Sequence, residues 1–172
     1  LAGPANRQGR IAADNICGGD SRYPGSQGSS VLKMFDTTIA TTGINEKTAS
    51  ALGLDYDYVI LSSNSHASYY PGAKAMTMKV LYEKGSLRLL GAQIIGKEGV
   101  DKRIDVLATA MYARLNAAQL KELDLAYAPP YSSAKDPVNM AGFMIENLAN
   151  GMVKQIHLPA LKDLPQDGSV TL

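Results

Sequence analysis

The stretch that most constrains the fold is a pair of apolar segments joined by a short turn. Over Ala75–Tyr82 apolar and polar residues alternate, which is typical of a β-strand with one buried face. A turn at Lys84–Gly85 separates it from a more continuously apolar segment, Leu87–Ile95, so the two are predicted to form an antiparallel hairpin. Gly91 and Gly96 indicate a β-bulge or the close approach of another backbone segment. The side chains predicted to share one face of the first strand are Met76, Met78, Val80 and Tyr82.

Further strands and helices are predicted on both sides of this hairpin. Met34–Thr42 and Asp57–Ser63 are rich in β-branched, aromatic and aliphatic residues and are expected to be strands. Strands that precede a run of helices predict an α+β fold, an antiparallel sheet with helices packed on one face. The expected helix starts are Pro4, Asn45, Asp101, Asn116 and Asp136, the last four as caps.

Composition narrows the classes of partner. The chain of 172 residues is long enough for one compact domain, and a net charge of +1 predicts no nucleic-acid partner. No apolar run approaches the length of about 18 residues that a membrane span needs, so no membrane partner is predicted. The two histidines lie far apart, so no metal site is predicted. The single cysteine, Cys17, excludes an internal disulfide, fits a cytoplasmic location and is expected to be a buried, unreactive thiol.

Two predicted loops carry tyrosines. The first spans His66–Gly72, and the second is an arm over Leu125–Pro137 that Pro129 and Pro130 stiffen by fixing the backbone. A phenol both donates and accepts a hydrogen bond, but the chain lacks a complete catalytic set, so these phenols would assist a reaction centred elsewhere. Alternatively they are half-buried packing residues. The tyrosines are Tyr69, Tyr70, Tyr127 and Tyr131.

Three motifs together resemble one enzyme family. LAGPANRQGRIAADNI at Leu1–Ile16 resembles the flavin-contacting segment of the pyridine nucleotide-disulfide oxidoreductases, and Met34–Asn150 resembles their C-terminal dimerisation domain. HASYYPG from His66 and AYAPPYS from Ala126, followed by DPVN from Asp136, resemble the branch of coenzyme A-disulfide reductases and NADH oxidases. The resemblance covers nearly the whole chain.

This resemblance implies a division of the chain and a set of absent parts. Residues 1–30 would be a flavin-contacting helix and connecting loop at the end of a missing FAD domain. Residues 31–151 would be the dimerisation domain, and residues 152–172 a linker toward a missing rhodanese-like domain. FAD and NAD(P)H would be bound mainly by missing N-terminal domains, so the isolated chain is expected to be inactive.

The resemblance also implies roles for particular residues. In a homodimer, Tyr69 and Tyr127 would reach the partner's redox cysteine and a coenzyme A disulfide or persulfide substrate, with Tyr70 and Tyr131 as the neighbours most easily confused with them. Arg7 would bind a coenzyme A phosphate or, equally, be a solvated helix residue. The positions expected to contact the flavin are Pro4, Ala5 and Asn6.

Other readings of the same residues differ in function. The chain could be the same domain of an NADH oxidase or peroxidase. Replacement of a tyrosine in the Tyr69 loop or the Tyr127 loop would indicate that alternative. It could also be a purely structural dimerisation domain, in which the tyrosine loops only pack. Glutathione-reductase-type members use a His–Glu pair in the arm, and the arm has no histidine.

Overall fold

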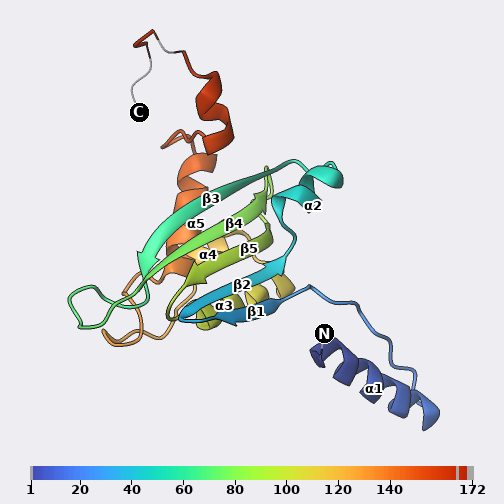
Figure 1. The fold of residues 1–172 in the computed structure, drawn as a ribbon. Coiled ribbons are helices and arrows are strands. Elements are labelled where there is room, and N and C mark those ends of the chain that lie inside the picture. Colours follow the sequence, from blue (N-terminus) through green and yellow to red (C-terminus); the bar gives the residue numbers. More distant parts are fainter. Residues whose placement is uncertain (1, 166, 170–172) are drawn as a thin grey trace.

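The computed structural model describes residues 2–165 and 167–169, and it contains one five-stranded antiparallel sheet (Figure 1). The strand order is β1-β2-β5-β4-β3, which confirms the predicted α+β class with an antiparallel sheet. Leu1 of the flavin-type motif and positions 166 and 170–172 of the expected linker lie outside the described residues. The strands are β1 (Ser30–Met34), β2 (Thr37–Gly43), β3 (Tyr56–Asn64), β4 (Ala75–Glu83) and β5 (Leu89–Gly96).

The predicted hairpin forms the middle of the sheet. Strands β4 and β5 pair in antiparallel register, with Met78 opposite Ile94 and Val80 opposite Ala92. All four of the predicted inward side chains of β4 are buried in the main core. The register slips at Tyr82, which pairs with Leu89 and leaves one extra residue beside Gly91.

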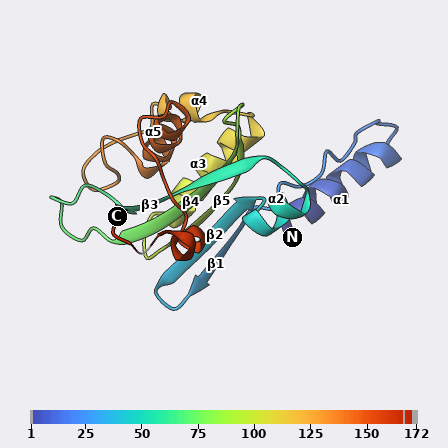
Figure 2. The ribbon, with the colours of Figure 1, turned by 90° about the horizontal axis from the view of Figure 1, so that it is seen from above.

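Three helices cover one face of the sheet, as predicted, and Figure 2 shows them together on that side. Helix α3 packs on β2 and β5, while α5 packs on β3 and on α4. The short helix α2 sits at the opposite face, where Ala49 joins a small second core with Tyr58 and Leu81. The helix bounds are α2 (Glu46–Ala51), α3 (Val100–Tyr112), α4 (Ala117–Lys121) and α5 (Pro137–Ala149).

The first predicted strand is wrong in its extent. Residues 34–42 do not form one strand, because Phe35 adopts a left-handed conformation (φ 54°) and makes a turn between β1 and β2. Sequence patterning missed most of β1, since all five of its residues are exposed and it has no buried face to impose an alternation.

Helix caps were predicted with one error. Asn45, Asn116 and Asp136 each accept a hydrogen bond from the first turn of α2, α4 and α5. Asp101 does not cap α3, which begins two residues earlier than expected. The cap position is Gly99, which has a left-handed backbone (φ 73°) and makes no side-chain bond.

The first helix, α1 (Ala2–Ile16), lies apart from the sheet in both views (Figures 1 and 2). None of its residues is buried, so it contributes nothing to the core. Cys17, at its end, is exposed, which overturns the expectation of a buried thiol. The physical reason is that no other described element covers the end of α1.

After α5 the chain returns to the sheet. His157 lies with its ring stacked 3.8 Å from that of Tyr58 and its Nε2 2.6 Å from Asp57 Oδ1. The Gln155 side chain donates to the Tyr58 carbonyl at 2.9 Å. Gln155 and His157 are therefore held against β3, and a 3₁₀ helix, η1 (Leu158–Asp163), follows them.

The core tyrosine Tyr82 gives the fold a predictable alkaline limit. Burial, helped by the Asp57 carboxylate on the neighbouring strand, raises the pKa of Tyr82 from 10.0 to about 12. The folded state therefore holds this proton more tightly than the unfolded state, and stability is full below pH 10 and falls as the pH rises through 12. Urea unfolding at pH 9 and pH 11.5 would measure the loss. Tyr82→Phe should lose less stability over that range, and an equal loss in both proteins would contradict the assignment.

Candidate functional site

The two tyrosine loops meet at one end of the sheet (Figure 1). One loop joins β3 to β4, and the other is the arm between α4 and α5. A backbone hydrogen bond links them directly, because the Ala67 N–H donates to the Ser132 carbonyl at 3.0 Å. Residues that are distant in sequence are therefore neighbours in the fold.

Tyr69 and Tyr127 form the contact at the tips of these loops. Their hydroxyl oxygens are 2.6 Å apart, although the residues are separated by 58 positions in the sequence. Both side chains reach solvent, with exposed fractions of 74% for Tyr69 and 46% for Tyr127. The hydrogen bond to Tyr69, together with partial burial, raises the pKa of Tyr127 above 10.0. Because the pair uses one of its two phenol protons internally, the other remains available to an external acceptor.

The neighbouring tyrosines are placed differently. Tyr70 packs edge-on against the His66 ring, with 5.8 Å between ring centroids. The Tyr131 N–H donates to the Ala128 carbonyl in the turn of the arm, and its side chain is exposed. The structure thus brings together the two tyrosines singled out from the sequence rather than either neighbour.

His66 has a structural position inside the first loop. Its Nε2 lies 3.2 Å from the Pro71 carbonyl and its Nδ1 lies 3.1 Å from the Ser65 hydroxyl. Since a carbonyl only accepts, Nε2 carries the proton and the Ser65 hydroxyl donates to Nδ1. The imidazole therefore closes the loop locally.

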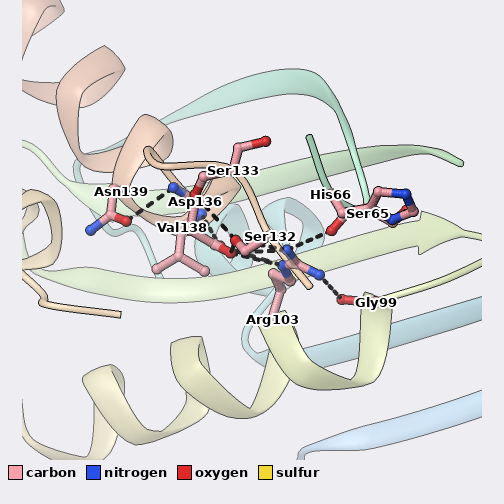
Figure 3. Close-up of polar contacts among 9 residues, drawn as sticks. All are labelled: Ser65, His66, Gly99, Arg103, Ser132, Ser133, Asp136, Val138 and Asn139. Atoms are coloured by element: carbon pink, nitrogen blue, oxygen red, sulfur yellow. Dashed lines mark hydrogen bonds and ion pairs between the residues drawn. The ribbon is translucent and has the colours of Figure 1, made fainter. Parts of the chain in front are cut away.

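Beneath the loops lies a buried charged cluster, shown in Figure 3. Arg103 rises from α3 and is only 1% exposed. Its Nη2 lies 2.9 Å from Asp136 Oδ2 and 2.8 Å from the Ser65 carbonyl, which accepts from it. Nε also donates to Asp136, and Nη1 donates to the Gly99 carbonyl at 3.2 Å. The guanidinium is paired on every side, as a buried charge must be.

The arm is anchored at both ends by the start of α5. Asp136 accepts from the Ser132 hydroxyl and from the Val138 N–H, so one carboxylate binds the arm and caps the helix. The Asn139 side chain donates to the Leu123 carbonyl at 3.0 Å, where the arm begins. These hydrogen bonds fix the position of the proline-stiffened arm relative to the start of α5.

Sequence patterning missed Arg103, although a signal was present. Val100, Arg103, Leu107 and Ala110 follow the spacing of the buried face of α3, so a charged residue stands at a core position. A buried arginine requires an acidic partner, and Asp136 had been assigned only as a helix cap. The core position of Arg103 and its need for an acidic partner would together have predicted the Arg103–Asp136 pair.

The proposed flavin-helix residues are not part of this cluster. Pro4, Ala5, Asn6 and Arg7 lie on α1, which stands away from the tyrosine loops in Figure 1. Asn6 Nδ2 donates to the Ala2 carbonyl at 2.9 Å, a contact within the first turn. The structure thus brings Tyr69 and Tyr127 together, but it does not bring the α1 residues to that pair.

Two further properties bear on the kind of site. No helix within residues 2–165 and 167–169 is both long and apolar enough to cross a lipid bilayer. Across the part of the chain that the structure describes, no three or more His, Cys, Asp or Glu side chains gather in a way that could hold a metal ion.

Comparison with known proteins gives a consistent picture. The family described as "Pyridine nucleotide-disulphide oxidoreductase, dimerisation domain" matches residues 29–138. A coenzyme A disulfide reductase of Staphylococcus aureus is 42% identical over 144 residues, which are 83% of this chain and 32% of that protein. The chain therefore spans about a third of the length of the curated relatives it matches.

Two solved structures are similar over nearly the whole chain. The reduced Bacillus anthracis CoADR-RHD superposes with a TM-score of 0.91 at 50% identity, covering 95% of this chain and 29% of that one. An NAD-dependent persulfide reductase from A. fulgidus superposes with a TM-score of 0.87 at 46% identity, covering 92% of this chain and 29% of that one.

Proposed function

Because the chain belongs to the pyridine nucleotide-disulphide oxidoreductase dimerisation domain family, we propose that it serves a FAD-dependent, NAD(P)H-driven reductase of coenzyme A disulfide or of a related persulfide. The names of the relatives at 42–50% identity support these substrates. In this proposal residues 1–30 end a FAD domain, residues 31–151 form a homodimer interface, and residues 152–172 link to a further domain.

The observation that carries the proposal is the contact between the Tyr69 and Tyr127 hydroxyls at 2.6 Å. A reductase that splits a disulfide must stabilise the thiolate that leaves. In the proposed homodimer this pair reaches the partner's active site and donates its free proton to that thiolate in a hydrogen bond. Because the pair accepts internally, its outward hydrogen-bond donor is polarised.

The residues of α1 are accessible to a ligand. The helix has no buried residue, and a Cβ added at Gly9 would meet nothing within 4 Å. Pro4, Ala5 and Asn6 in its first turns would face the isoalloxazine ring, and the Arg7 guanidinium would pair with a phosphate of coenzyme A. Bound FAD would supply the electrons for disulfide reduction.

The test is the activity of phenylalanine variants in the full-length reductase. Tyr69→Phe/Tyr127→Phe keeps both rings and removes both hydroxyls, so NADH-driven reduction of coenzyme A disulfide should fall by about 100-fold. Tyr70→Phe/Tyr131→Phe is a matched control, since it removes two phenols from the same loops outside the pair. Flavin content and dimer mass should be unchanged in both proteins. Equal turnover in the two double variants would contradict a role in the reaction, and Tyr69 and Tyr127 would then be packing residues.

A further inference from the structure

We infer that Arg103 is a positioning residue, whose buried guanidinium holds the Tyr69 loop and the Tyr127 arm at the separation that lets the two phenols meet. The inference rests on the proposed function, which gives the phenol pair its role. The side-chain hydrogen bonds of Arg103 go to Gly99, Ser65, Ser132 and Asp136 and not to either phenol, so it would act only through the two loops (Figure 3).

The contacts of Arg103 join three separate parts of the fold. Nη2 donates to the Ser65 carbonyl at 2.8 Å, where β3 ends and the first loop begins. The same nitrogen lies 3.3 Å from the Ser132 hydroxyl of the arm and 2.9 Å from Asp136 at the start of α5. Nη1 is held by the Gly99 carbonyl of its own helix start. One rigid planar group thus fixes both loops relative to α3.

The distance from these contacts to the phenols is short along the chain. Ser65 precedes Tyr69 by four positions, and Tyr69 lies inside a turn that is closed by the Tyr70 N–H, which donates to the Ala67 carbonyl at 2.9 Å. On the arm, the Ser132 N–H donates to the Ala128 carbonyl at 3.2 Å, next to Tyr127. A displacement of Ser65 would therefore move Tyr69, and a displacement of Ser132 would move Tyr127.

The phenols themselves are poorly suited to hold the loops. Their single hydrogen bond is exposed to water, and an exposed neutral hydrogen bond contributes little net free energy. The anchor is instead buried, with Arg103 at 1% and Ser132 at 1% exposure. The buried anchor therefore sets the loop positions, and the phenol contact is its consequence.

The decisive variant is Arg103→Lys, compared with Leu107→Ala. A lysine keeps the positive charge beside Asp136 but lacks the fork that reaches Ser65 and Ser132 together. Leu107 lies one turn further along α3, is fully buried in the main core, and truncating it destabilises the domain without touching either loop. The control therefore separates loop position from loss of stability.

The readout is the titration of Tyr127 in the 172-residue chain, labelled with ¹³Cζ-tyrosine and assigned with Tyr127→Phe. In the unchanged chain the hydrogen bond to Tyr69 raises the pKa of Tyr127 above 10.0. We expect the titration midpoint to move down toward 10.0 in Arg103→Lys and to stay in place in Leu107→Ala. A midpoint that is unchanged in Arg103→Lys would overturn the inference, as would an equal shift in Leu107→Ala.

Turnover of coenzyme A disulfide in the full-length reductase then tests the proposed function separately. In Arg103→Lys, a lowered Tyr127 midpoint together with lowered turnover supports both the positioning role and the proposed function. A lowered midpoint with unchanged turnover supports the positioning role and contradicts the function proposed for the phenols. If Arg103→Lys gives no folded protein by circular dichroism, Ser132→Ala replaces it, since it removes one arm contact and keeps the charge pair. Its midpoint should shift in the same direction by less, and no shift would overturn the inference.

Discussion

Asp136→Ala is expected to lower the free energy of unfolding by about 3–5 kcal/mol, because it leaves the charge of Arg103 buried without a partner. The pair is almost fully enclosed, with side-chain exposures of 2% for Arg103 and 3% for Asp136. The same substitution removes the acceptor for the Val138 N–H, and so the side-chain cap of α5. Urea denaturation with an unchanged slope would measure the effect.

The control for this prediction is the same change at an exposed carboxylate. Asp36 pairs with Lys97 on the surface, where the side chains are 68% and 55% exposed, and water screens the pair. Asp36→Ala should therefore unfold close to the unchanged chain. Asp136→Asn keeps an oxygen for the cap and loses the charge, so it should fall between the two. If Asp136→Ala and Asp36→Ala unfold at the same urea concentration, the buried pair does not stabilise the fold.

Local patterns predicted the parts of this fold that bury one regular face. The β4 alternation placed Met76, Met78 and Val80 in the core, and side-chain caps placed the starts of α2, α4 and α5. Patterns failed where a segment buries nothing, as in β1, or where glycine takes the place of a capping side chain, as at Gly99. Strand β1 is held by its pairing with β2, and at the start of α3 the left-handed backbone of Gly99 takes the cap position without a side-chain bond.

The candidate site shows the same limit. The two loops were visible in the sequence as separate tyrosine-bearing segments, but their meeting depends on the sheet order and on Arg103. The choice of Tyr69 and Tyr127 came from resemblance to a family. Their hydroxyl contact is a structural finding, and their action on a substrate remains a prediction.

Gly91→Ala is expected to destabilise the domain by about 3 kcal/mol or more, at the upper end for an overpacked interior. A Cβ at this position would stand 1.8 Å from the Ile44 carbonyl oxygen and 2.9 Å from the Ile44 nitrogen. Both are backbone atoms, so no side-chain rotation relieves the overlap. The crossing is also fixed by the Ile44 N–H, which donates to the Leu90 carbonyl at 3.0 Å, so relief requires moving the junction of β2 and α2.

Gly53→Ala separates this overlap from the general cost of replacing glycine. Gly53 has a left-handed backbone (φ 65°), and a Cβ added there would meet nothing within 4 Å, so alanine should cost about 1–2 kcal/mol from backbone strain alone. Gly91 has no such strain, and its larger loss would come from the backbone contact itself. The sequence left a bulge and a close approach as alternatives at Gly91, and the structure has a register slip beside it and Ile44 against it. If thermal unfolding showed Gly91→Ala to be no less stable than Gly53→Ala, Ile44 would not be held at this crossing, and the slip beside Gly91 would be the sole reason for glycine at this position.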